Sequence, residues 1–309
     1  MQRVIVARLI QTPIALVAVL LVVFLCLLAT GDPVEMLAPP EATAADKEQL
    51  RHAYGLDQPA IVQFGVFLTH AVRGDFGRSF FKGKPALDLV LERFPASLQL
   101  AVASTVIALL VGVPLGIIAA VRRGTLVDQL AMGLALLGQS IASFWLALML
   151  ILLFAVNLHW LPVSGYQGPQ YLVLPAVSLS FWLLALLARL TRSEMLEVLS
   201  EDYVRTARAK GLRDWAVLTH HALRNTLIPL VTMTGLSLGW QLGGALVVEA
   251  VFAWPGLGLL LLESVLRRDY PVVLAGITLL ATVFIVLNLL VDLLYVYVDP
   301  RIRQGSATV

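Results

Sequence analysis

Charged residues are scarce in this chain of 309 residues: lysine, arginine, aspartate and glutamate together make up 14% of it. A soluble globular domain has about 25% of such residues, because its surface must be kept in water. The net charge of +2 is too small to indicate a polyanionic partner such as a nucleic acid. Cys26 is the single cysteine, which excludes a disulfide framework and a multi-cysteine metal site. The composition therefore argues against a soluble enzyme and against a nucleic-acid-binding protein.

The hydrophobic residues, 59% of the chain, are gathered into long stretches without charge. A helix needs about 20 mostly apolar residues to cross a bilayer. The longest charge-free stretch, 129–188, is long enough for two such helices joined by a turn. Helices are expected because lipid leaves no backbone group unpaired and the apolar runs do not alternate with period two. The sequence thus predicts an all-α membrane protein with six transmembrane helices, at 9–30, 98–121, 130–156, 172–190, 227–249 and 271–297.

Arginine and lysine indicate the orientation of these spans. Cytoplasmic segments carry the excess of positive residues, whereas loops longer than about 60 residues count little. With the N-terminus inside, the inner segments hold thirteen positive residues and the short outer loops hold two, Arg267 and Arg268. The first span is longer than the apolar region of a signal peptide and lacks its cleavage pattern. We expect a cytoplasmic N-terminus (1–8), a first span (9–30), an outer helical segment (31–97), a core with five spans (98–297) containing an inner loop (191–226), and a cytoplasmic C-terminus (298–309).

The outer segment 31–97 has the pattern of short helices. A polar helix is expected from Thr43 to Tyr54, and a second over 61–72, opened by Pro59. A third is expected over 85–94. Two interpretations are open: a cap packed on the membrane domain, or a docking surface for a soluble partner. The residues alone favour the cap.

The inner loop 191–226 predicts a helix, a glycine turn and a second helix. Leu196, Leu199, Tyr203 and Ala207 recur at spacings of three and four, which places them on one apolar helical stripe. An apolar stripe in a region without lipid suggests a protein partner. The loop's other expected features are an ion pair between Glu201 and Arg205, a helix end at Gly211, a second helix over 215–224 capped by Asp214, and Pro229 in the first turn of the fifth span.

Motifs of common catalytic sites are missing. The chain contains neither a phosphate-binding G-x-x-x-x-G-K-[ST] loop nor an H-E-x-x-H zinc motif. The G-x-S-x-G motif of hydrolases is missing too. Five histidines are scattered, and the adjacent pair on one helix points in different directions. We therefore expect a non-catalytic chain that binds no metal and no cofactor directly.

Few ionisable residues lie within the spans. Asn288 and Asp292 share one face of the last span, and the interpretation we favour is a buried pair between Asp292 and an arginine such as Arg189 or Arg192. Glu249, at the outer end of the fifth span, is expected to reach water. An ion-driven carrier normally has charged or unwound elements near the midplane, so this pattern weighs against one.

Glycines at spacing four mark two spans. Gly235, Gly239 and Gly243 form such a ladder on the fifth span, and Gly112 and Gly116 a shorter one on the second. Small residues let membrane helices approach closely. Packing is the favoured role, and room for a translocated solute along the fifth span is the alternative.

The inner loop has a recognisable sequence. Residues 201–212 (Glu-Asp-Tyr-Val-Arg-Thr-Ala-Arg-Ala-Lys-Gly-Leu), followed by 221–225 and Ile228-Pro229, resemble the cytoplasmic "EAA" loop of ABC importer permeases. More narrowly, the chain resembles the dipeptide/oligopeptide/nickel (glutathione) permease family, first-permease ("B") type. Arg205 and Thr206 depart from the general Glu-Ala-Ala start, as in the peptide branch. Further matches are Gly31-Asp32-Pro33, Gly55-Leu56-Asp57-Gln58-Pro59, Gly74-Asp75-Phe76-Gly77, Trp254-Pro255-Gly256-Leu257-Gly258, Arg268-Asp269-Tyr270-Pro271 and Asp299-Pro300-Arg301-Ile302-Arg303.

This resemblance implies the type I ABC importer permease fold and a bacterial inner-membrane location. It implies the permease subunit of an ATP-driven, binding-protein-dependent importer for dipeptides or oligopeptides. The short outer loop 157–171 makes glutathione or a nickel chelate the alternative solutes, and an ion-driven secondary transporter is the alternative class. The implied partners are a sister permease, two cytoplasmic ATPase subunits that use ATP with Mg²⁺, an extracytoplasmic solute-binding protein, and membrane lipid. The residues expected to couple the chain to the ATPases are Tyr203, Arg205, Thr206, Ala207, Lys210, Gly211, Leu212, Asp214 and Trp215.

Overall fold

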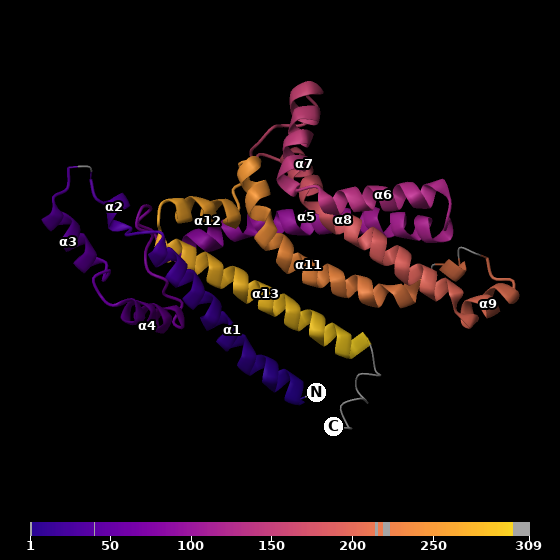
Figure 1. Ribbon diagram of the computed structural model, residues 1–309, viewed down its shortest axis with the longest axis horizontal. Helices are drawn as coiled ribbons and strands as arrows, with labels where there is room; N and C mark the ends of the chain where they lie inside the picture. Colours follow the sequence, from indigo (N-terminus) through magenta and orange to yellow (C-terminus); the bar gives the residue numbers. More distant parts are fainter. Residues whose placement is uncertain (1, 40, 214–215, 219–222, 299–309) are drawn as a thin grey trace. The chain divides into compact units, whose positions relative to one another are not determined.

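A computed structural model of the chain describes residues 2–39, 41–213, 216–218 and 223–298. The expected all-α fold is confirmed: the described segments are built from helices joined by turns (Figure 1). The helices divide into two compact units, Met1–Ser97 with Pro255–Ile285 (unit 1) and Leu98–Trp254 with Val286–Val309 (unit 2). Helices α5 and α13 contribute to both units.

The helices of unit 1 come from two separate stretches of the chain, 1–97 and 255–285. They are α1 (Gln2–Ala29), α2 (Val34–Leu37), α3 (Ala44–Ala53), α4 (Ala60–Ala71), the start of α5 (Ala86–Val121), α12 (Leu257–Leu266) and the start of α13 (Tyr270–Val298). The expected polar helix after residue 43 is α3. Thr43 caps it, because its hydroxyl accepts from the Asp46 backbone N–H while the Asp46 carboxylate accepts from the Thr43 N–H.

Unit 2 holds most of the long apolar helices. Besides the remainder of α5 and α13 it contains α6 (Leu126–Ser140), α7 (Ser143–Leu150), the π-helix η1 (Ile151–Asn157), α8 (Pro169–Ser200), α9 (Asp202–Ala209) and α11 (Leu223–Val251). Among the described residues, four helices are long and apolar enough to cross a membrane, namely α5, α8, α11 and α13. The described apolar part of α1, Pro13–Ala29, is shorter.

The third expected span, 130–156, is bent. Helix α6 meets α7 at an angle of 105°, and the two together could form one broken span (Figure 1). Ile141 and Ala142, between them, have extended backbone conformations. Hydropathy cannot reveal such a bend, because both arms are apolar.

Prolines interrupt the helices less than the sequence predicts. The helix expected over 85–94 and the span expected from residue 98 form the single helix α5, which continues through Pro95. Pro229 lies inside α11, six residues after its start, and not in its first turn. Membrane helices tolerate proline because neighbouring helices and side chains satisfy the freed backbone groups.

Segment 31–97 packs against apolar helices, as the cap interpretation expects. Phe24 and Leu27 of α1 pack with Tyr270, Val273 and Leu274, so α1 lies beside the start of α13, and Phe64 and Phe67 of α4 cover this cluster. A second cluster joins the start of α5 to α12 and α13 through the buried residues Ala86, Leu89, Val90, Leu257, Leu260, Leu261, Val272 and Ala275. Burial of aromatic and branched side chains therefore ties the cap to two apolar helices.

In unit 2, α5 and α8 approach closely at two glycines. A Cβ atom at Gly112 would lie 2.7 Å from the carbonyl oxygen of Leu184, and one at Gly116 would lie 2.5 Å from that of Ala188. Neither backbone oxygen can move without shifting α8. The packing role expected for these two glycines is confirmed.

Candidate functional site

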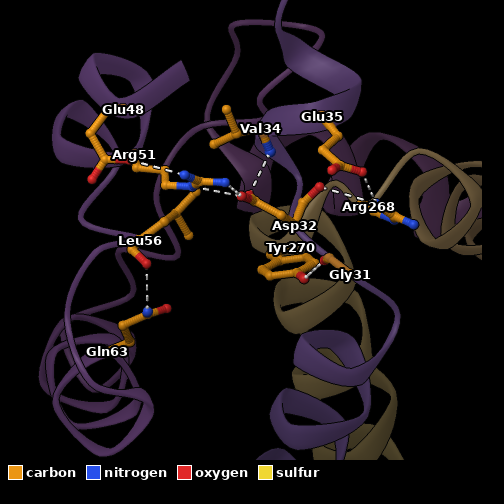
Figure 2. Close-up of polar contacts among 10 residues, drawn as sticks. All are labelled: Gly31, Asp32, Val34, Glu35, Glu48, Arg51, Leu56, Gln63, Arg268 and Tyr270. Atoms are coloured by element: carbon orange, nitrogen blue, oxygen red, sulfur yellow. Dashed lines mark hydrogen bonds and ion pairs between the residues drawn. The ribbon is translucent and has the colours of Figure 1, made fainter. Parts of the chain in front are cut away.

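Four of the motifs that resemble those of the permease family lie in unit 1, at 31–33, 55–59, 74–77 and 268–271. Asp32 is the centre of a polar network there (Figure 2). One of its carboxylate oxygens accepts from Arg51 Nε at 2.7 Å, and the other accepts from the Val34 N–H at 2.9 Å. The backbone oxygen of Asp32 accepts from Arg268 at 3.1 Å. Charge-assisted hydrogen bonds of this kind are the stronger ones in proteins, so Asp32 fastens the loop after α1 to α3 and to the turn before α13.

Gly31 makes room for this arrangement. Its φ of +112° is rarely adopted by side-chain-bearing residues, and a Cβ there would lie 2.8 Å from the guanidinium atoms of Arg268. Arg268 itself has a φ of +57°. The Tyr270 hydroxyl then donates to the backbone oxygen of Gly31 at 2.6 Å (Figure 2). The Gly-Asp-Pro motif (31–33) and the Arg-Asp-Tyr-Pro motif (268–271) are thus hydrogen-bonded to each other.

Asp269 of the Arg-Asp-Tyr-Pro motif is buried, with 4% of its surface exposed. Its carboxylate accepts from the Ser79 hydroxyl at 2.5 Å and from the Phe80 N–H at 3.1 Å. Burial raises the pKa of Asp269 above its ordinary value of 3.8, although both hydrogen bonds act to lower it. Asp269 therefore holds the loop before α5 against the turn before α13.

The remaining cap motifs are turns. Gly74 and Gly77 have φ values of +79° and +78°, and the Asp75 carboxylate accepts from the Gly77 N–H at 2.9 Å. This hydrogen bond lowers the pKa of Asp75. Gln63 donates to the backbone oxygens of Leu56 (Figure 2) and Gln58, at 3.2 and 2.8 Å. These residues shape the cap.

The Trp-Pro-Gly-Leu-Gly motif follows α11. Trp254 is 1% exposed, and its ring meets that of Tyr166 edge-on, with centroids 4.7 Å apart. In unit 1, the Leu257 N–H donates to the Ser97 hydroxyl at 2.7 Å. The motif therefore ends one helix and starts the next with buried anchors.

In segment 191–226, the apolar stripe differs from the one expected from the sequence. The helix breaks at Glu201, which is extended, so α8 and α9 are separate. Tyr203, expected on the apolar stripe, is 41% exposed, whereas its neighbour Val204 is completely buried with Ala207 and Val217. Val204 therefore takes the buried place expected for Tyr203, whereas Ala207 is buried as expected. A single helical period cannot anticipate a break of this kind.

The described polar side chains of α9 are exposed. Arg205 pairs with Asp202 at 3.4 Å on the exposed surface, and not with Glu201 as expected. Thr206 donates its hydroxyl hydrogen to the backbone oxygen of Asp202, and its own backbone oxygen accepts from the Lys210 N–H.

The turn after α9 is made by Gly211, which has a φ of +80° and ends the helix as expected. Leu212, the next residue, is 43% exposed. Asp214 and Trp215 lie outside the described residues. The structure thus brings Arg205, Thr206, Lys210 and Leu212 to one exposed, short helix and its turn.

The polar residues of the spans differ from expectation. Arg192 pairs with Asp128 of α6, at 2.6 and 2.8 Å, and Arg189 donates to Gln139. The side chain of Asp292 lies outside the described residues. Glu249, expected to reach water, is completely buried. The arginines favoured as partners of Asp292 thus bond to α6.

Along α11, the glycines of the ladder have different surroundings. A Cβ at Gly235 would collide with Val291 of α13, Gly239 is half-buried, and Gly243 has no described atom within 4 Å of the position of its Cβ. Asn288 of α13 has a buried Oδ1 without a hydrogen-bond partner among the described residues. Close packing is therefore local to Gly235.

Sequence reasoning missed a buried polar contact between α5 and α11. The Ser104 hydroxyl donates to Gln241, whose amide donates to Thr105 at 2.9 Å. All three residues are buried. The available signal was Gln241 itself, a large amide within an apolar run, since such a group in lipid needs a partner on another helix.

Comparisons with known proteins match these features. Residues 112–304 match the family described as binding-protein-dependent transport system inner membrane component, and residues 1–101 match the corresponding N-terminal family. The chain is 46% identical over 288 residues to the glutathione transport system permease protein GsiC of Salmonella typhimurium (strain LT2), covering 93% of this chain and 94% of that protein. The GsiC protein of Escherichia coli (strain K12) matches with the same identity and coverage.

A solved structure shares the fold. The methionine ABC transporter MetNI, in inward-facing conformations, aligns with a TM-score of 0.56 at 19% identity, over 68% of this chain and 96% of that chain. The expected type I permease fold is thereby confirmed. The family match sets aside the ion-driven carrier. Several helices apolar enough to span a membrane agree with a membrane protein. The chain belongs to the binding-protein-dependent transport system inner membrane component family and is a multi-pass permease subunit of an ABC importer.

Proposed function

We propose that this permease imports glutathione or a small peptide of similar size. The observation that carries the proposal is the 46% identity, over 93% of the chain, to permeases named for glutathione transport. The short connection between η1 and α8, which occupies 158–168, agrees with the glutathione- or nickel-type outer loop noted in the sequence. Dipeptides, oligopeptides and nickel chelates are the competing solutes.

The chain works in this proposal as one part of an assembly. It pairs with a sister permease, while two cytoplasmic ATPase subunits bind and hydrolyse ATP with Mg²⁺ and a solute-binding protein delivers the solute from outside. Membership of the binding-protein-dependent family supports the ATPase and binding-protein partners. This chain itself carries out no covalent chemistry. Its termini and the loop 191–226 lie in the cytoplasm, and 31–97 lies outside.

Helix α9 is the coupling element in this proposal. It is short, its inner side is fixed by the buried Val204 and Ala207, and its outer side presents polar groups beside the exposed Tyr203. A rigid element of this kind can transmit ATPase closure to the spans on either side of it. The residues that would contact the ATPase are Tyr203, Arg205, Thr206, Lys210 and Leu212, together with Asp214 and Trp215.

The test is uptake by the complete importer reconstituted in liposomes with internal ATP and external binding protein. We expect labelled glutathione to accumulate, and unlabelled glutathione to compete better than a dipeptide or a nickel–histidine chelate. Liposomes loaded with ADP are the matched control. Uptake of the dipeptide or the chelate without glutathione uptake would refute the proposed solute and leave the permease role intact.

A further inference from the structure

A pocket of about 280 Å³ lies in unit 1 between α4, the loop after α3, and the neighbouring ends of α1 and α13. Apolar and aromatic side chains form most of its wall. The lining includes Phe24, Phe67, Phe76, Phe80 and Leu274, together with Val62 and Val66 of α4. Its volume is slightly below the range of about 300–1,000 Å³ for drug-sized ligands, so it fits a slender apolar group.

Several polar groups of the wall are already bonded within the cap. Gln63 donates to the backbone oxygens of Leu56 and Gln58, and His70 lies 3.4 Å from Asp75. A charged peptide entering this mostly apolar pocket would lose water and gain few partners in exchange, which is costly. The pocket therefore suits hydrocarbon and does not suit the transported solute.

The position of the pocket along the bilayer normal follows from α13. The described apolar part of α13 has 22 residues, which is about 33 Å of helix, close to the hydrocarbon thickness of about 30 Å. Tyr270 begins this helix and Leu274 follows one turn later, about 6 Å along the axis. Both line the pocket, so the pocket lies where the acyl chains meet the headgroups.

Helix α4 forms one wall of the pocket and resembles an interfacial helix. Its 12 residues are too short to cross a bilayer, and residues 58–72 contain no Asp, Glu, Lys or Arg. None of its described residues is buried, and Ile61 is 86% exposed although it is apolar. Exposed apolar residues also continue along α1, with Val22 at 60% and Leu25 at 50%. Exposed apolar residues without charge, on both α4 and α1, are what a lipid-facing surface presents.

We propose that this pocket binds one acyl chain of a membrane phospholipid, with α4 lying in the interface beside it. The bound chain fills the space between the aromatic side chains and thereby supports the cap that holds Asp32 and Asp269 in place. The occupant is a lipid because the pocket lies at the end of a membrane-spanning helix and is lined mostly by apolar side chains.

The test uses the complete importer in vesicles of phosphatidylethanolamine and phosphatidylglycerol. A minor fraction of the lipid is a phosphatidylcholine whose acyl chain carries a photoreactive diazirine. After irradiation, mass spectrometry locates the labelled residues. We expect saturable labelling around Val62 and Leu274, whereas labelling at the exposed Leu110 of α5 (70% exposed) should rise in proportion to the probe.

Two variants that fill the pocket and one matched control sharpen the result. In Val66→Trp the indole occupies the pocket, and labelling at Leu274 should fall roughly tenfold, which corresponds to about 1.4 kcal/mol. Val62→Phe, a smaller change, should lower it less. Ile61→Trp places the same indole on α4 outside the pocket and should leave labelling at Leu274 unchanged.

Three results would overturn the proposal. The first is wild-type labelling at Val62 and Leu274 that fails to saturate. The second is equal labelling of Leu274 in Val66→Trp and Ile61→Trp. The third is protection of these residues from aqueous labels by the solute-binding protein without any lipid labelling, which would assign the pocket to a protein partner.

Discussion

The space beside Gly31, where a side chain would begin, is filled by the guanidinium of Arg268. In Gly31→Ala the methyl group must displace that guanidinium from the backbone oxygen of Asp32, and the backbone must also hold alanine at a φ of +112°. We expect a loss of about 1–3 kcal/mol in stability, measured as a lower unfolding temperature of the purified importer. Gly65→Ala in α4 is the control, because no described atom lies within 4 Å of its Cβ position. Equal stability of the two variants would contradict the fit described for Arg268.

Asp269 makes the stability of the protein depend on pH, and the direction of this dependence follows from the burial of its carboxyl group. Its pKa is raised above 3.8 in the folded protein, so its stabilising contribution is complete below pH 3.8 and is lost as pH rises through the folded-state pKa. The side chain of Asp269→Asn does not titrate. We therefore expect the unfolding temperature of Asp269→Asn to rise relative to wild type as pH increases over this window.

Asp75→Asn is the matched control for this measurement. Because the pKa of Asp75 is lowered by the Gly77 N–H, its contribution is present above pH 3.8 and is lost as pH falls through its folded-state pKa. The unfolding temperature of Asp75→Asn should therefore rise relative to wild type as pH decreases. If both variants follow pH in the same direction, the burial of Asp269 does not control its titration.

At the scale of the element, the turn after α9 tests the coupling proposal. Gly211 has a φ of +80°, which a β-branched residue adopts only with strain of about 1–3 kcal/mol. In Gly211→Val we expect ATP hydrolysis to continue while solute uptake per ATP falls severalfold, because α9 no longer ends in the required direction. Gly124→Val imposes similar strain at another positive-φ turn, with φ +77° after α5, and should change this ratio less. Unchanged uptake per ATP in Gly211→Val would refute the coupling role of this turn.

Helices and turns could be predicted from the sequence, whereas breaks and bends within helices could not. The apolar runs predicted helices and the glycines predicted turns, because hydropathy and backbone freedom are local properties. The break at Glu201 and the 105° bend after Ser140 depend on contacts between elements, so composition could not reveal them. The burial of Glu249 was missed for the same reason: a residue near a helix end reaches water only if no other helix covers it.

At the scale of the whole molecule, the family motifs join segments that are far apart in the sequence. Asp32 and Arg268 are separated by 236 positions, and Ser79 and Asp269 by 190. The sequence made the motifs recognisable but could not show that they contact one another, because pairing over such separations is set by the packing of α1, α5 and α13. Unit 1 is thus assembled from two stretches of the chain, 1–97 and 255–285, that are far apart in the sequence.

The topology proposed for the whole chain rests on the distribution of positive residues, since membrane insertion retains Arg- and Lys-rich short loops in the cytoplasm. In a Cys26→Ser background, Glu41→Cys in the outer segment and Glu197→Cys near the end of α8 each provide one thiol. We expect a membrane-impermeant maleimide applied from outside the inner membrane to modify the thiol of Glu41→Cys, and that of Glu197→Cys only after the membrane is opened. Modification of both thiols without opening the membrane would refute the topology. The opposite order would invert it and would place α9 out of reach of the ATPase subunits.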